Sequence, residues 1–337
     1  TQINPGATTL NLEQFKGLLV AGVSQGTMYG LIAIGYSMVY GVLGFINFAH
    51  GEVFMIGSMS GFITSEKLFA AGIWQDQFVL SFVIIMVVAV LSSTSTAVIM
   101  ERVAYRPLRS SPRMILLITS IGVSFFLQSA VLGLMGPATK TYPPLPETLS
   151  TVRRPLGFLS DVPVLRWFDF AISGTRMMVF VVSAISFGAL WLLVERTKTG
   201  KAMRAVAEDK EIASLMGIAV DRTIVLTFAV GGAMAGIAGI MWGLTFRSIT
   251  NVTGFLPGIK GFTAAVVGGV GNLGGAMVGG IGLGSVEALA PLMILEPLGV
   301  NSASQLRDLV AFSALVLVLL FKPTGLFGEK LSAEDRT

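Results

Sequence analysis

The chain contains no cysteine and one histidine, His50. It therefore cannot form disulfides, thiolate metal sites or iron–sulfur clusters, and a single histidine argues against a protein-built zinc site. Charge is also scarce, because 12% of the 337 residues are Asp, Glu, Lys or Arg, against about 25% in an ordinary soluble domain. Together with 53% hydrophobic residues, this excludes an ordinary soluble enzyme and favours a chain whose solvent is lipid.

The small basic excess, a net charge of +4 with a pI of about 9.4, has two possible origins. Nucleic-acid-binding proteins are basic, and so are the cytoplasmic loops of membrane proteins. Here the basic residues gather in the short segments 101–113 and 195–222, between uncharged stretches. We therefore expect a lipid bilayer as partner and no nucleic acid.

Long runs without Asp, Glu, Lys or Arg are abundant. A helix needs about 20 mostly apolar residues to cross about 30 Å of hydrocarbon. Such runs cover 17–51, 78–100, 114–136, 177–194, 223–246, 261–286 and 309–321, and a short one covers 53–65. We expect an all-α polytopic integral membrane protein with about eight transmembrane helices, in a range of about eight to ten.

The positions of Lys and Arg predict the orientation, since short cytoplasmic loops are basic. The two basic segments, with Arg102, Arg106, Arg109, Arg113, Arg196, Lys198, Lys201, Arg204, Lys210 and Arg222, are expected to be cytoplasmic. The proline-rich stretch 137–176 is then an external loop, with a short helix around Trp167, and 323–337 is a cytoplasmic tail. No compositional break divides the chain, so 1–337 is expected to form one transmembrane domain.

Two stretches are too long or too rich in glycine for one continuous helix. Residues 17–51 would form a helix of about 50 Å, and Gly35, Gly41, Gly44, Asn47 and Gly51 punctuate it. We expect a break there. Residues 258–290 require two passes or a re-entrant pair that turns near Asn272. Broken helices of this kind line the substrate paths of many transporters.

Asn47, His50 and Glu52 interrupt the first long apolar run, and polar groups at such depth are functional by default. We expect them to close the helix break, with Glu52 holding His50 or a free backbone N–H; direct substrate contact and gating are the alternatives. The turn residues Gly269, Gly271, Asn272 and Gly274 complete the candidate translocation path or gate.

The segment Gly269–Gly274 also fits the dinucleotide pattern G-x-G-x-x-G, but it lacks the preceding strand and the following soluble helix. Gly200-Lys201 is not a Walker A lysine, because residue 202 is Ala rather than Ser or Thr. We therefore expect no catalytic residue, no metal site and no cofactor on this chain.

The segment 201–217 is predicted to be one amphipathic cytoplasmic helix. At 100° per residue, one arc of about 80° contains Ala202, Val206, Ala213 and Met216. The opposite side contains Arg204, Glu208 and Glu211. Asp209 lies within the apolar side. Helices that lie on headgroups favour large apolar residues and a basic polar face. Alanine and mixed charge indicate a protein partner instead.

Glu211–Gly217 resembles the E-A-A-x-x-x-G motif of ABC importer permeases, with Ile212 in place of the first alanine. Three further motifs are Ile46–Glu52, Val103–Arg109 and Phe262–Gly271. With these motifs, the chain resembles the permease subunits of branched-chain amino-acid ABC transporters of the LivH type. The resemblance extends from about residue 15 to about residue 328. The resemblance implies that a short cytoplasmic helix docks on an ATPase. Arg204, Glu208, Asp209, Glu211, Ala213 and Gly217 are the expected ATPase-coupling residues.

The resemblance further implies a bacterial inner (plasma) membrane importer. This chain would pair with a homologous, LivM-like permease, with two ATPase subunits that bind ATP-Mg, and with an external solute-binding protein. The expected cargo is a branched-chain or other neutral amino acid, with urea or short amides as the alternative. A stand-alone channel or ion-coupled carrier is the other alternative, and acids paired with cations inside several spans would favour it.

Overall fold

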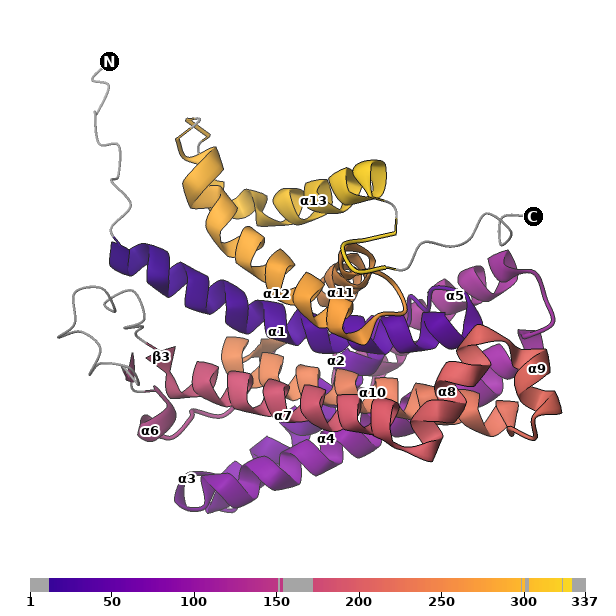
Figure 1. The fold of residues 1–337 in the computed structure, drawn as a ribbon. Helices are drawn as coiled ribbons and strands as arrows, with labels where there is room; N and C mark the ends of the chain where they lie inside the picture. Colours follow the sequence, from indigo (N-terminus) through magenta and orange to yellow (C-terminus); the bar gives the residue numbers. More distant parts are fainter. Residues whose placement is uncertain are drawn as a thin grey trace.

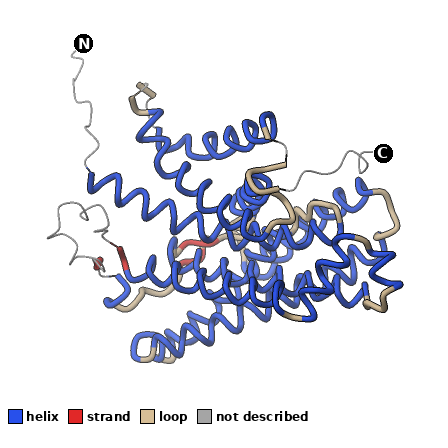
Figure 2. The backbone as a smooth tube through the Cα atoms, viewed as in Figure 1, coloured by secondary structure: helices blue, strands red, loops and turns tan. Residues whose placement is uncertain are grey.

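The computed structural model describes residues 12–150, 152–153, 172–297, 299–300, 303–322 and 324–328. In this part of the chain the structure is a bundle of long helices with two distinct ends (Figures 1 and 2). The end that we call the loop end carries α3 (Ile73–Asp76), α6 (Glu147–Ser150) and β3 (Ile172–Ser173). The opposite end, which we call the basic end, carries α8 (Lys198–Glu208) and α9 (Lys210–Leu215).

Six helical segments among the described residues are long and apolar enough to cross a membrane. They are α1 (Leu12–Leu43), α4 (Phe78–Met100) with the turns η1 (Glu101–Tyr105) and η2 (Arg106–Leu108), α5 (Arg113–Met135), α7 (Gly174–Arg196), α10 (Val220–Phe246), and α12 (Leu273–Ala290) with η5 (Pro291–Leu295). Further helices are α2 (His50–Ala70), α11 (Phe255–Gly268), η6 (Ala303–Leu306) and α13 (Arg307–Phe321). The all-α polytopic class is confirmed, while the number of crossings stays a prediction.

The first long apolar run breaks where we expected. Helix α1 ends at Leu43, Gly44 takes a left-handed φ of 72°, and α2 begins at His50. The chain folds back at this point, because the ring of His50 lies directly against Gly35 in the interior of α1. Helix α2 therefore begins inside the apolar layer rather than at its edge.

The second long stretch forms a hairpin of α11 and α12. Its turn contains Gly269 and Gly271, with left-handed φ angles of 105° and 91°, and Asn272 is the N-cap of α12. This confirms the predicted turn near Asn272. Helix α11 has 14 residues and is therefore about 21 Å long, shorter than the hydrocarbon layer.

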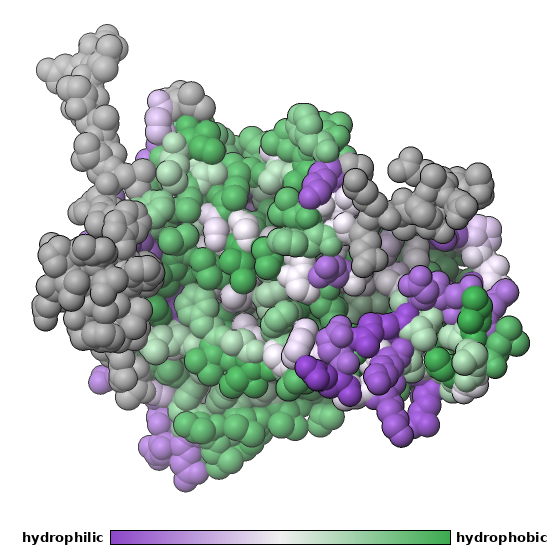
Figure 3. All heavy atoms as spheres, in the orientation of Figure 1, coloured by the Kyte–Doolittle hydropathy of each residue, from purple (hydrophilic) through white to green (hydrophobic). Residues whose placement is uncertain are grey.

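Helix α1 lies at the centre of the bundle and packs along α12 (Figure 1). The approach is close, because an ideal Cβ atom on Gly26 would lie 2.7 Å from the carbonyl oxygen of Gly280. Small residues permit such packing where lipid supplies no hydrophobic drive between helices. The exposed flanks of the bundle are apolar, and hydrophilic atoms gather over α8 (Figure 3).

The described residues include two short antiparallel pairs, one at the loop end and one further inside the bundle (Figure 2). β1 (Lys140–Thr141) pairs with β4 (Ser248–Ile249), and β2 (Val152–Arg153) pairs with β3. The first pair leads into Tyr142, which is buried between α2 and α10 and donates its hydroxyl to the carbonyl of Ser58 at 2.6 Å. The helix predicted around Trp167 lies outside the described residues.

Candidate functional site

Asn47 lies in the break between α1 and α2 and is buried. Its side-chain oxygen accepts hydrogen bonds from the backbone N–H of Ala49 at 3.2 Å and from the hydroxyl of Tyr105 at 2.6 Å. A helix that begins inside the membrane leaves amide donors without intrahelical partners. Asn47 satisfies one donor of this segment and ties the break to the end of α4.

His50 is the first residue of α2, and its ring packs edge-on against Tyr36 with 4.8 Å between the ring centroids. Its Nε2 atom is buried and has no hydrogen-bond partner among the described residues. Gly35 makes room for the ring, since a Cβ atom at that position would overlap the imidazole. His50 is therefore enclosed by α1.

The prediction that Glu52 holds His50 or a free backbone N–H was wrong. Its Oε1 atom accepts hydrogen bonds from Ser124 Oγ at 3.1 Å and from Gln128 Nε2 at 2.7 Å, both on α5, and its Oε2 atom has no partner among the described residues. The carboxyl group points across to another helix rather than back to His50 or to the backbone of the break. Glu52 thereby links α2 to α5.

A polar stripe on α5 was missed by the sequence analysis. Ser120, Ser124 and Gln128 are spaced by four residues and lie on one face of the helix. Ser120 accepts from the N–H of Phe48 at 3.3 Å, and Ser124 and Gln128 bind Glu52. The regular spacing inside an otherwise apolar run was the signal that could have revealed it.

The second group of candidate path residues forms the α11–α12 turn. Asn272 accepts from the N–H of Gly275 at 2.8 Å and donates its amide to the carbonyl of Phe327 at 3.1 Å. A Cβ atom on Gly269 would collide with the backbone of Phe327 and Gly328, whereas Gly274 has no close neighbour besides Asn272. The turn therefore packs directly against the C-terminal segment 324–328.

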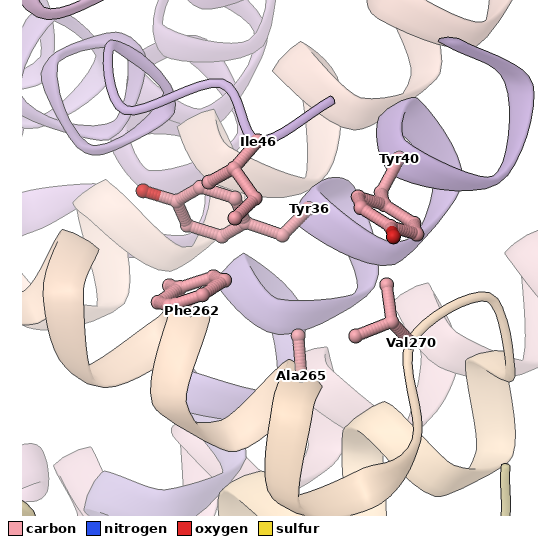
Figure 4. A pocket seen from close by; sticks show the side chains of 6 residues that line it. All are labelled: Tyr36, Tyr40, Ile46, Phe262, Ala265 and Val270. Atoms are coloured by element: carbon pink, nitrogen blue, oxygen red, sulfur yellow. The ribbon is translucent and has the colours of Figure 1, made fainter. Parts of the chain in front are cut away.

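The two groups do not touch through their named side chains. A small apolar cleft lies between them, lined by Tyr36, Tyr40, Ile46, Phe262, Ala265 and Val270 (Figure 4). Ile46 directly precedes Asn47, and Val270 lies between Gly269 and Gly271. The break and the turn therefore form opposite walls of one cleft.

The predicted single helix over 201–217 was wrong, because the chain breaks at Asp209. Asp209 is the N-cap of α9, and its Oδ1 atom accepts from the N–H groups of Glu211 at 2.7 Å and Ile212 at 2.9 Å. An aspartate before a short helical run is a strong capping signal, and it outweighed the apolar periodicity. We call residues 198–217, with this break, the elbow.

The break changes which face of the elbow is exposed. Val206 and Ala213 are buried, as the helical arc predicted, but Met216 is 78% exposed. Ile212 and Leu215 are 59% and 86% exposed, so that the three residues form an apolar surface on α9. We call Ile212, Leu215 and Met216 the elbow patch.

The backbone geometry at Gly217 terminates α9, whose last residue is Leu215. Gly217 has a φ of 82°, its N–H bonds to Ser214, and the N–H of Ile218 bonds to Ala213. This is a Schellman ending, which places a glycine in the left-handed region just past the helix. Gly217 therefore determines the direction in which the chain leaves the elbow patch.

The other predicted coupling residues have distinct surroundings. Arg204 donates to the carbonyl of Val194 at 3.0 Å and pairs with Glu195 at 2.6 Å, which ties α8 to the end of α7. Glu208 and Glu211 are exposed. Arg204, Asp209, Ala213 and Gly217 therefore build the elbow, and Glu208 and Glu211 lie on its surface.

An ion-pair network joins the α4–α5 connection to α10. Arg106 and Arg109 both pair with Asp221, at 2.7 and 2.5 Å, and Arg109 also pairs with the buried Glu101. Burial, together with the guanidinium groups of Arg109 and Arg113, lowers the pKa of Lys210 on α9. Positive charge is thus concentrated beside the elbow.

A buried ion cluster near the loop end was also missed. Lys260 of α11 pairs with Glu287 of α12 at 2.7 Å and with Asp308 of α13 at 2.6 Å. Its partners are distant in sequence, so a lone lysine in an apolar stretch gave no local signal. Among the described residues no group of three or more His, Cys, Asp or Glu side chains could hold a metal ion.

Comparison with known proteins identifies the family. The family model described as "Branched-chain amino acid transport system / permease component" matches residues 18–319. The chain is 41% identical to the high-affinity branched-chain amino acid transport system permease protein BraD of Pseudomonas aeruginosa, over 92% of this chain and 94% of that protein. It is 40% identical to the corresponding protein LivH of Escherichia coli strain K12, over 91% and 93%. A probable branched-chain amino acid transport permease protein LivH of Methanocaldococcus jannaschii is 28% identical over 93% and 92%. The chain therefore belongs to the family of branched-chain amino acid transport permease components, and it is a multi-pass membrane transport subunit.

Proposed function

We propose that the chain is one of two homologous permeases that together form the translocation path of an ABC importer for branched-chain or other neutral amino acids. Relatives that are 40% and 41% identical over nearly their whole length are named as high-affinity branched-chain amino acid transport system permease proteins. The partner permease is expected to be LivM-like. ATP-Mg binds on two separate ATPase subunits, and the complex lies in the bacterial inner membrane.

The elbow patch is the structural observation that carries this proposal. Ile212, Leu215 and Met216 are large apolar side chains exposed at the basic end of the molecule. The positive-inside rule assigns the basic end to the cytoplasm, where an ATPase subunit would meet it. A rigid helix of six residues, with Asp209 at its start and Gly217 just past its end, presents the patch.

The loop end is then external and faces the solute-binding protein. Trp74 and Gln75 both donate to the carbonyl of Pro144, at 2.9 and 2.8 Å, which fastens α3 to the chain after β1. Tyr142 anchors the same stretch between α2 and α10. These contacts give the external surface a defined shape on which a folded protein can dock.

The mechanism that follows is alternating access. ATP binding brings the ATPase subunits together, and the elbow transmits their movement to α7 through Arg204 and to α10 through the chain after Gly217. Ile46 of the break and Val270 of the turn both line the apolar cleft, so a relative movement of the break and the turn changes its width. The free energy of ATP binding and hydrolysis therefore reaches the permease only through the elbow.

The experiment is reconstitution in liposomes with both permeases, with and without the ATPase subunits and the loaded solute-binding protein. We expect uptake of labelled leucine only when the ATPase subunits and ATP are present. A stand-alone ion-coupled carrier would use buried ion pairs such as Lys260–Glu287. Uptake driven by a proton or sodium gradient without the ATPase would overturn the proposed function.

A further inference from the structure

The Lys260 cluster joins four helices in the half of the bundle near the loop end. Lys260 and Glu287 are 5% and 4% exposed. Gln25 of α1 donates to Glu287 at 3.3 Å and to the hydroxyl of Tyr29 at 2.6 Å, and Lys260 lies 5.7 Å from the centre of the Tyr29 ring. Charged groups inside a membrane protein are costly and are retained where they serve a function.

The charges in this cluster do not balance. One ammonium group, on Lys260, faces two carboxylates, on Glu287 and Asp308. The second oxygen of Glu287, Oε2, is buried and has no hydrogen-bond partner among the described residues. A buried carboxylate oxygen without a donor is destabilising, so the cluster lacks a positively charged group or another hydrogen-bond donor.

The cluster is also accessible from one side. The side chain of Asp308 is 48% exposed, whereas those of Lys260 and Glu287 are nearly buried. Asp308 is the second residue of α13, at the end of the helix nearest the external surface in the proposed topology. A molecule that arrives from that side meets Asp308 first.

We propose that Glu287 and Asp308 form a recognition site for the ammonium group of a zwitterionic amino acid, with Lys260 as the counter-charge for its carboxylate. This inference rests on the proposed import function and narrows its substrate class. In a free amino acid the ammonium and carboxylate groups are attached to the same carbon atom. When such a molecule binds, its ammonium group pairs with Glu287 and Asp308, and its carboxylate pairs with Lys260. The ion pairs within the cluster are thus exchanged for ion pairs with the ligand.

The same chemistry disfavours the alternative cargo. Urea and short amides could donate an N–H group to Oε2 of Glu287, but they are uncharged, so they can neither balance the second carboxylate nor replace a carboxylate on Lys260. A pathway for such solutes has no need of three ionisable groups at its outer end, where each carries a desolvation cost. The cluster therefore selects for amino acids over neutral amides.

The test uses the permease pair with its ATPase subunits in lipid nanodiscs, without the solute-binding protein, so that the binding protein's own specificity does not contribute. Thermal unfolding is measured with and without leucine at about 100 mM. We expect leucine to raise the melting temperature by at least about 2 °C. 4-Methylpentanoate, which is leucine without its ammonium group, and acetamide should not raise it.

Glu287→Gln and Asp308→Asn should each abolish the leucine-dependent rise, whereas Glu296→Gln should keep it. Glu296 is the matched control, because it is an exposed acid at the same end of α12. If the Glu287→Gln complex does not assemble, two measurements still test the inference. They are the leucine-dependent rise of Asp308→Asn, and the response of the unmodified complex to leucine, 4-methylpentanoate and acetamide.

A purely structural ion cluster gives a different result. It predicts lower melting temperatures in both variants, with a rise on leucine addition equal to that of the unmodified complex, and that result would overturn the inference. An equal rise with 4-methylpentanoate, or no rise with leucine, would also overturn it. Since ATP-driven uptake is measured separately, either outcome would leave the proposed function standing.

Discussion

The phenolic hydroxyl of Tyr105 lies 2.6 Å from the side-chain oxygen of Asn47 and donates a hydrogen bond to it. Tyr105 belongs to the π-helical turn after α4, and Asn47 to the break before α2. The two residues are 58 positions apart and lie in two of the sequence motifs that gave the family resemblance. These motifs are thus halves of one buried hydrogen-bonded unit.

The first prediction concerns Glu52. Glu52→Leu removes the acceptor for Ser124 and Gln128 and leaves the buried hydroxyl of Ser124 without that acceptor, which should destabilise the protein by about 1 to 3 kcal/mol. Glu52→Gln keeps one acceptor oxygen and should be milder. Thermal unfolding of the purified protein measures the difference, with Glu66→Leu on the exposed part of α2 as the control. Unchanged stability with an altered amino-acid preference would instead assign Glu52 to substrate recognition.

The second prediction concerns the end of the elbow. Gly217→Val forces a β-branched residue into a left-handed conformation, at a cost of about 1 to 2 kcal/mol, and should displace the elbow patch. We expect reduced ATPase binding and uncoupled ATP hydrolysis, with the membrane helices intact. Gly188→Val on α7, where a Cβ atom would meet no neighbour, is the control. Parental transport by Gly217→Val would argue against a coupling role.

The elbow patch gives the third prediction. Leu215→Asp and Met216→Asp should each weaken ATPase binding at least about tenfold, since a carboxylate placed in an apolar contact is costly to desolvate. Stability of the free permease should not change, because both side chains lie at the surface. Binding is measured by pull-down of the ATPase at graded concentrations. Val252→Asp, at an exposed apolar residue outside the elbow, should bind normally; if it weakens binding as much, the patch is not the docking surface.

The fourth prediction separates two roles of Asn272. Asn272→Ala loses both the cap on α12 and the bond to Phe327, and should cost about 1 kcal/mol or more. Asn272→Asp keeps the acceptor for Gly275 but loses the donor to Phe327. Unfolding measurements on both variants assign the cost: if they match, the contact with the C-terminal segment dominates, and if Asp resembles the parent, the cap does.

Local sequence rules predicted the elements whose causes are local. The break after Leu43 followed from the excess length of an apolar run, and the turn near Asn272 from its glycines. The break at Asp209 was equally local, since an aspartate ahead of a short helical run is an N-cap signal. It was missed because the apolar periodicity of segment 201–217 was taken to continue across Asp209.

Partners across the bundle could not be predicted in this way. Glu52 reaches Ser124 and Gln128, and Lys260 reaches Glu287 and Asp308, only because separate helices pack side by side. An ionisable residue in an apolar run indicates that a partner exists but not which helix supplies it. The chemistry of the candidate site was therefore predictable, and its pairing was not.

The C-terminal segment completes the hairpin of α11 and α12. Leu326 and Phe327 donate their N–H groups to the carbonyls of Val267 and Gly268 at 2.8 and 3.1 Å, at the otherwise open end of α11. During synthesis these carbonyls leave the ribosome well before their donors exist. The hairpin therefore cannot reach its final hydrogen bonding until translation has passed residue 327.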